Sequence, residues 1–207
     1  MFTLILKGGI LLWPILALSI VSLAIILEKL YTFHKIKIDT NQLLADIMKL
    51  LREGGVDKAG ERCSQSISPF VRISTLVFKY HNFSQRQKNE LFSQFRAMEI
   101  RKLGKRVRAL GIIGHILPLL GLLGTVVGMI KVFMVVENVA GSVDPALLAG
   151  GIWEALLTTA AGLAVAIPTL MVYHYLEGRL EDSALQMGEV VVRTEEFLKE
   201  RKNENNR

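Results

Sequence analysis

Cysteine is almost absent from the 207-residue chain, in which Cys63 is the only one, so no internal disulfide can form. A single cysteine suits a reducing compartment, and Cys63 is most simply a small core residue. The sequence also lacks a His-Glu-x-x-His pair and any nucleophile or phosphate-binding motif. We therefore expect no enzymatic activity, no catalytic residue, no metal site and no cofactor.

Charge is absent from one long stretch and almost absent from two others. Residues 8–27 are 20 residues without a charge, and 109–130 and 155–176 are runs of 22 without Asp, Glu, Lys or Arg, each with one histidine, His115 and His174. About 20 apolar residues cross a bilayer as a helix. The first run is too long for the core of a secretion signal and has no convincing cleavage site. The sequence therefore predicts an all-α integral membrane protein with three transmembrane helices.

Basic residues are missing from one connection and abundant in the others. Lys and Arg number 17 between Lys29 and Arg108 and 6 from Arg179 onward, but none lies between Glu137 and Trp153. Basic loops stay in the cytoplasm, so the N-terminus should be periplasmic and the C-terminus cytoplasmic. The net charge of +6 then orients the chain, and we expect no nucleic-acid partner.

Helical periodicity continues on the cytoplasmic side of the second and third spans. We expect both helices to extend into a cytoplasmic helical domain, which we interpret as a solvated amphipathic bundle. The predicted segments are a first transmembrane helix (1–29), a cytoplasmic helical insert leading into helix 2 (30–108), a second transmembrane helix (109–136), a short periplasmic loop (137–146), a third transmembrane helix (147–178) and a cytoplasmic helical tail (179–207).

Capping residues and prolines predict where helices begin. An apolar helical pattern over residues 43–51 should end at Gly54-Gly55. The charged stretch after residue 84 should continue as one helix through Arg108 into the second span. The predicted helix starts are Ser68-Pro69, Ser84 with Gln87, and Asp144-Pro145.

One carboxylate, Glu154, lies in the small-residue helix of the third span. An ionisable group inside a membrane segment is costly and is by default a candidate for function. At about 1.5 Å per residue, Thr125 and Thr159 lie at similar depths, with Glu154 one to two turns further out. Thr158 shares the face of Glu154, whereas Thr159 lies about 140° away. These side chains form a candidate proton path; the alternative is that Glu154 is structural and Thr158 bonds its own helix.

Small residues line both helices of this hairpin. Gly124 and Gly128 form a small-xxx-small pair, as do Thr158 and Gly162. Together with Gly121, these glycines should let the second and third spans pack closely as an antiparallel pair. The small-residue surface exceeds what one hairpin can use, which predicts a homo-oligomer.

A lysine, Lys131, lies near the outer end of the second span, at about the depth of Glu154. It is about 240° around the helix from Thr125, so we expect its side chain to reach outward to the interface. An ion pair with Glu154 is the alternative. Pairing would favour the charged carboxylate, whereas burial alone would favour the neutral acid.

Two segments, LLGLLGTVVGMIKVF (119–133) and GGIWEALLTTAAGLAVAIPT (150–169), resemble the two membrane signatures of the MotA/TolQ/ExbB proton-channel family. The resemblance covers essentially the whole chain: an outward N-terminus, three spans, a large loop between the first two and a helical tail. Three spans and the sequence Glu-Ala-Leu-Leu-Thr-Thr are more similar to the ExbB and TolQ branches, ExbB first, than to the MotA branch.

The resemblance implies a proton-channel subunit that couples proton-motive force at the bacterial inner membrane to work at the outer membrane. It implies a lipid-embedded pentamer around a single-span ExbD- or TolR-like partner, whose membrane aspartate carries the proton, and a TonB- or TolA-like protein. The family's pore threonines match Thr125 and Thr159, and its acid matches Glu154. Lys131 departs from the neutral or weakly polar residue expected there.

These motifs leave alternatives open. They do not separate an ExbB-type protein from TolQ of the Tol-Pal system or a MotA-like stator subunit, nor do they separate H⁺ from Na⁺. A non-conducting membrane scaffold is a competing class, in which Glu154 only anchors helix packing. An intramembrane enzyme is a third class, without a supporting motif.

Overall fold

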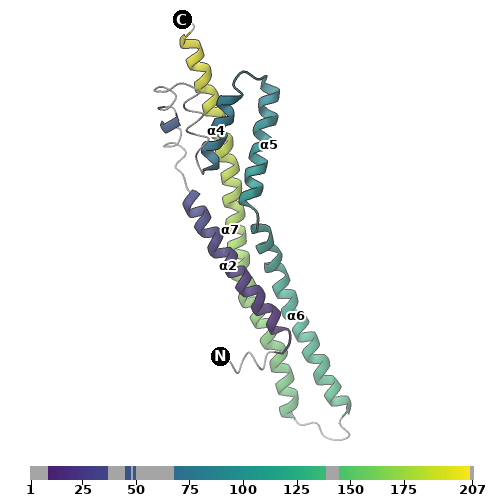
Figure 1. Cartoon of the computed structure of the whole chain (residues 1–207). Helices are drawn as coiled ribbons and strands as arrows, with labels where there is room; N and C mark the ends of the chain where they lie inside the picture. Colours follow the sequence, from purple (N-terminus) through teal and green to yellow (C-terminus); the bar gives the residue numbers. More distant parts are fainter. Residues whose placement is uncertain (1–8, 37–44, 48, 50–67, 139–144, 206–207) are drawn as a thin grey trace. The chain divides into compact units, whose positions relative to one another are not determined.

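The structure, a computed structural model, describes residues 9–36, 45–47, 49, 68–138 and 145–205. The described residues are mainly helical and contain no β-strand. Cys63 and most of the helix expected over residues 43–51 lie outside them, as does Gly54-Gly55. The helices are α2 (Leu12–Ile36), α4 (Pro69–Lys79), α5 (Gln85–Leu103), α6 (Val107–Asn138) and α7 (Pro145–Asn205), shown in Figure 1.

Three of these helices, α2, α6 and α7, are each long and apolar enough to cross a membrane. The all-α membrane fold expected from the sequence is therefore confirmed. Their outward faces remain apolar: Leu119 on α6 is 63% exposed and Met171 on α7 is 69% exposed in the single chain. Such faces suit lipid or further protein subunits rather than water.

The predicted helix starts agree with the structure wherever it describes them. α4 begins at Pro69 after the N-cap residue Ser68, and α7 begins at Pro145. The N-cap residue of α5 is Ser84, whose backbone N–H donates to Gln87 Oε1 over 3.2 Å. Caps act between residues a few positions apart, which is why the sequence predicts them well.

The charged helix does not continue unbroken into the second span, so that expectation was wrong. α5 ends at Leu103, and the Gly104 N–H donates to the Ile100 carbonyl over 2.8 Å. Arg106 has φ 78°, a left-handed conformation that costs roughly 1–2 kcal/mol for a residue with a Cβ. Its guanidinium forms an ion pair with Glu28. Glycine has low helix propensity, and here it marks the end of α5.

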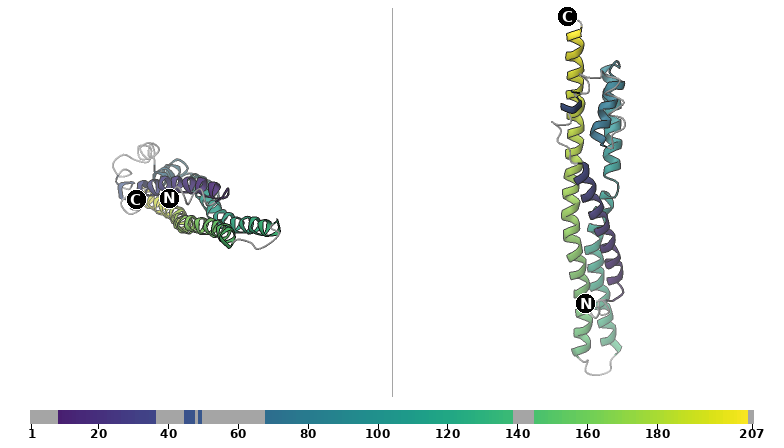
Figure 2. Two further views of the ribbon diagram at one scale, coloured as in Figure 1. Left: turned by 90° about the horizontal axis from the view of Figure 1, so that it is seen from below. Right: turned by 60° about the vertical axis from the view of Figure 1, so that its left-hand side comes forward.

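The chain divides into two compact units, of which the first comprises Met1–Leu30 and Arg106–Leu176. In this unit α6 and the first part of α7 lie side by side as an antiparallel pair (Figure 2). Leu117 of α6 and Ala166 of α7 are almost fully buried, as is Ile15 of α2. This unit holds all of the predicted site residues.

The second unit comprises Tyr31–Lys105 and Glu177–Arg207. It contains a buried carboxylate, Glu99, which is 3% exposed and forms ion pairs with Arg72 and, over 2.9 Å, with Lys102. The core of the unit is apolar and is built from α4, α5 and the second part of α7: Phe70, Ile73, Val77, Phe92, Met187, Val190 and Val191.

Candidate functional site

Glu154 lies on α7 and forms an ion pair with Lys131 of α6. The Lys131 Nζ is 3.0 Å from Glu154 Oε1, and the glutamate side chain is 29% exposed. The structure therefore contains the ion pair, which was the alternative expectation for Lys131. An angle around α6 does not say which face α7 covers, and the flexible lysine stem bridges the remaining distance.

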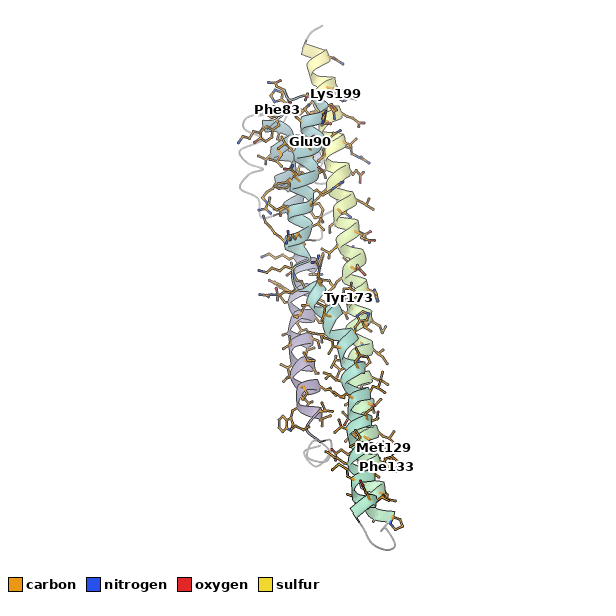
Figure 3. The ribbon with its side chains drawn as sticks, turned by 90° about the vertical axis from the view of Figure 1, so that its right-hand side faces the viewer. Phe83, Glu90, Met129, Phe133, Tyr173 and Lys199 are labelled. Atoms are coloured by element: carbon orange, nitrogen blue, oxygen red, sulfur yellow. The ribbon has the colours of Figure 1, made fainter. Side chains whose placement is uncertain are left out.

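Large apolar residues lie close to this ion pair in the sequence. Ile130 and Phe133 on α6 are 53% and 64% exposed, and Trp153 on α7 is 53% exposed. Phe133 is labelled near the end of the α6–α7 pair in Figure 3. A charged pair among such residues is expensive to hold in an apolar environment unless each charge compensates the other.

The glycine turn before α2 contacts the same carboxylate. A Cβ added at Gly9 would lie 2.0 Å from Glu154 Oε1, so the carboxylate lies directly against the backbone of this turn. Gly9 has φ 66°, which glycine adopts readily and other residues do not. The Leu12 N–H donates to the Gly9 carbonyl over 3.3 Å and ties the turn to α2.

Sequence reasoning missed Gly9. The signal was a Gly8-Gly9 pair ahead of an apolar run, which is typical of a turn. Such a pair does not indicate what the turn contacts. With Gly9, the surroundings of Glu154 come from α6, α7 and the turn that leads into α2.

Two of the candidate threonines bond to their own helices. Thr158 Oγ1 donates to the Glu154 carbonyl over 2.9 Å, and Thr125 Oγ1 donates to the Leu122 carbonyl over 2.7 Å. Thr158 is only 2% exposed, so it lies in the helix contact rather than on an open face. The hydrogen bond that the structure shows for Thr158 is therefore the alternative expected from the sequence, a bond to a carbonyl of its own helix.

Thr159 bonds across the hairpin instead. Its Oγ1 donates to the Gly121 carbonyl of α6 over 2.6 Å. Gly121 lies about one turn from Thr125, which keeps Thr125 and Thr159 within about a turn of each other in depth. The Lys131–Glu154 pair lies further along the hairpin, on the side of the connection between α6 and α7.

Glycines set the close approach of α6 and α7. A Cβ added at any of the four predicted packing positions would come within 3.0 Å of the other helix. Tyr173, labelled in Figure 3, faces Gly111 further along the same pair. The nearest atoms to the added Cβ are Thr159 Cα at 3.0 Å for Gly121, Thr158 Cγ2 at 2.4 Å for Gly124, Ala155 Cβ at 2.7 Å for Gly128 and the Leu117 carbonyl oxygen at 2.7 Å for Gly162.

The polar groups on this helix pair include a carboxylate and hydroxyls. Glu154 is a carboxylate that can accept and release a proton, and hydroxyl groups lie further along the same helix pair. His115 also lies on α6, where its Nδ1 is 2.7 Å from the Gly111 carbonyl oxygen of its own helix. Among the described residues, no group of three or more His, Cys, Asp or Glu side chains gathers as a metal site would require.

Comparison with known proteins yields one family match. Residues 72–189 match the MotA/TolQ/ExbB proton channel family, a range that includes most of α4, all of α5 and α6 and much of α7. The solved structure of C. jejuni MotAB is similar in fold, with a TM-score of 0.62 and 14% identity over 95% of this chain and 77% of that chain.

Curated relatives carry ExbB and TolQ names. An ExbB homolog of Methanothermobacter thermautotrophicus is 31% identical over 85% of this chain, but the match spans only 62% of that relative's length. The biopolymer transport protein ExbB of Neisseria meningitidis serogroup A is 27% identical over 84% of this chain and 80% of its own. The Tol-Pal system protein TolQ of Haemophilus influenzae is 40% identical over 40% of this chain and 36% of its own.

Proposed function

The chain belongs to the MotA/TolQ/ExbB proton channel family, and from this premise we propose that it is the channel subunit of a proton-driven complex in the bacterial inner membrane. The complex converts proton-motive force into mechanical work on a partner protein. We propose no enzymatic activity. We assign Glu154, Thr125 and Thr159 to the proton path. Thr158, which is buried against Gly124 of α6, packs the two helices beside that path.

A single observation carries this proposal: Glu154 is a carboxylate within an apolar helix pair and is the only acid between Asp144 and Glu177. Trp153 and Leu156, close to it in the sequence, are large, apolar and exposed, and the helix that carries it is packed through glycines against α6. An acid retained in such surroundings is costly for packing alone, which supports a role that needs its proton.

The exposed apolar faces of α6 and α7 support an oligomer. Leu119, Leu156 and Ile167 are each 59–63% exposed in the single chain. We propose a pentamer that encloses the single membrane helix of an ExbD- or TolR-like protein with a membrane aspartate. That partner links the channel to a TonB- or TolA-like protein reaching the outer membrane. The insert and the C-terminal tail are cytoplasmic, and the connection between α6 and α7 is periplasmic.

The ExbB branch is our first proposal, because the relatives that match over most of this chain carry the ExbB name. TolQ of the Tol-Pal system is the second, supported by a shorter match of higher identity. A non-conducting scaffold has one observation in its favour, the Lys131–Glu154 ion pair, because such a pair also anchors helix packing.

Replacement of Glu154 by glutamine tests the proposal. We would co-reconstitute the full chain with an ExbD- or TolR-like single-span protein and measure proton uptake with a pH-sensitive dye under an imposed potential. Glu154→Gln keeps the shape but cannot titrate, so flux should be lost while the oligomer still forms. Glu154→Asp should retain part of the flux.

Glu137 provides the matched control. It is an exposed acid at the end of α6, and Glu137→Gln should conduct like the unchanged chain. Normal flux through the Glu154→Gln channel would make the carboxylate structural and would favour the scaffold.

A further inference from the structure

The apolar part of the α6–α7 hairpin contains one Lys or Arg side chain, Lys131, and it forms an ion pair with Glu154, the proposed proton-path acid. Lys131 is the only Lys or Arg from residue 109 to residue 178. Its Nζ is 3.0 Å from Glu154 Oε1. A lone charge of either sign is costly in a membrane-spanning segment, and the contact lets the two charges compensate each other.

The second contact with Glu154 comes from a different part of the chain. The turn at Gly9 leaves no room for a side chain, because an added Cβ would lie 2.0 Å from Oε1 and 2.9 Å from Cδ of the carboxylate. The same oxygen, Oε1, therefore faces the lysine from α6 and the glycine backbone ahead of α2. Two elements that meet at one oxygen restrict the positions that this carboxylate can take.

We propose that Lys131 and the Gly9 turn act as a clamp that positions the Glu154 carboxylate, with Lys131 as its counter-ion. The clamp deepens the proton-path proposal and rests on it for its functional meaning. In the resting subunit the carboxylate is held against α6. To exchange a proton with a partner group it must first leave Lys131, so the lysine sets how readily the acid becomes available.

The contact also explains a residue that helix packing alone does not require. The small-residue contacts of α6 with α7 involve Gly121, Gly124 and Gly128. Lys131 lies about one turn beyond Gly128, between the apolar residues Ile130 and Val132 in the sequence. An apolar residue would serve packing equally well there. A cation is useful at this position because an acid lies opposite it.

Infrared difference spectroscopy tests the clamp without measuring flux. The spectrum of the full chain in lipid bilayers, minus that of Glu154→Gln, isolates the carboxylate signal of Glu154. That signal should shift or disappear in Lys131→Met, which removes the counter-ion. Lys131→Arg keeps a cation and should retain a signal close to that of the unchanged chain. An identical Glu154 signal in all three proteins would overturn the role of Lys131.

Glycine substitutions test the other half of the clamp. Gly9→Ala should shift the Glu154 signal, because the new methyl group overlaps the carboxylate position. Gly150→Ala is the matched control, since a Cβ at Gly150 has nothing within 4 Å and should leave the signal unchanged. An unchanged signal in Gly9→Ala would overturn the contribution of the turn.

The spectroscopic result and the flux result are independent. If Glu154→Gln conducts normally while the Lys131→Met signal shifts, the clamp stands as a structural contact and the proton-path proposal fails. If Glu154→Gln blocks flux while the Glu154 carboxylate signal is unchanged in Lys131→Met, the proton path stands and the clamp fails. Should Lys131→Met not fold, Lys131→Gln takes its place, because it keeps a polar side chain but removes the cation. Its Glu154 signal should shift, and an unchanged signal would overturn the role of Lys131.

Discussion

Replacing Gly162 by alanine should loosen the hairpin that carries Glu154. Gly162 is buried on the face of α7 that meets α6. A Cβ there would lie 2.7 Å from the Leu117 carbonyl oxygen and 3.2 Å from Gly121 Cα. Both contacts are backbone atoms, which cannot rotate out of the way as a side chain can. The helices must therefore separate for the methyl group to fit.

The size of the effect follows from that geometry. A carbon–oxygen contact normally measures about 3.3–3.6 Å, so the Leu117 carbonyl must retreat by about 0.6–0.9 Å. Gaps of about 0.5–1 Å lose a quarter to a half of the attraction in each neighbouring contact, and overpacking costs about 1–3 kcal/mol in all. Alanine regains about 0.5–1 kcal/mol through its better helix propensity. We expect a net loss of about 1 kcal/mol in the free energy of unfolding.

Gly178→Ala on the same helix supplies the reference. A Cβ at Gly178 has nothing within 4 Å, so this substitution should stabilise the chain by the propensity term alone, about 0.5–1 kcal/mol. The propensity term cancels between the two variants, and their difference should equal the overpacking cost of about 1–3 kcal/mol. The assay is denaturant unfolding of each full-length variant in mixed micelles, followed by circular dichroism. Equal stabilisation by both alanines would refute the close contact at Gly162.

Other expectations concern a cross-helix bond, the topology and the assembly. Thr159→Val removes the hydroxyl that donates to the Gly121 carbonyl over 2.6 Å, and it should lower the same free energy of unfolding by about 0.6–1.7 kcal/mol; no change would mean that the bond is not stabilising. In a Cys63→Ser background, an impermeant thiol reagent applied to intact cells should label a cysteine introduced at Ser142 and not one at Ser84, and the reverse pattern would invert the topology. Native mass spectrometry in mild detergent should find a homo-oligomer, five subunits being the proposed number, and a stable monomer would contradict it.

Local features of this chain were predictable from the sequence because they depend on neighbouring residues. α4 begins at Pro69 and α7 at Pro145, and a proline at the first helical position is a signal that the sequence shows directly. The three apolar helices follow from run length, since only about 20 residues without charge are needed to cross a bilayer. Glu154 stood out as a candidate because its surroundings in the sequence are apolar and small.

The interruption between helices α5 and α6 was not predictable from the sequence. Helix-favouring residues extend across Gly104, and a single glycine is often tolerated within a helix. Here α5 ends, and Arg106 takes a left-handed conformation in which its guanidinium reaches Glu28, 78 positions away in sequence. Because that partner belongs to α2, no window around Arg106 contains the reason for the break.

The sequence by itself determined three apolar helices, a glycine-lined second span and an acid in the third. Tertiary structure decided which atoms those features meet. Pairing of Lys131 with Glu154 depends on the register and rotation of α6 against α7, which the position of Lys131 on its own helix does not define. The contact of Gly9 with the same carboxylate joins residues 145 positions apart, and only packing brings them together. Periodicity acts along one helix, whereas a site between helices exists only once their mutual arrangement is set.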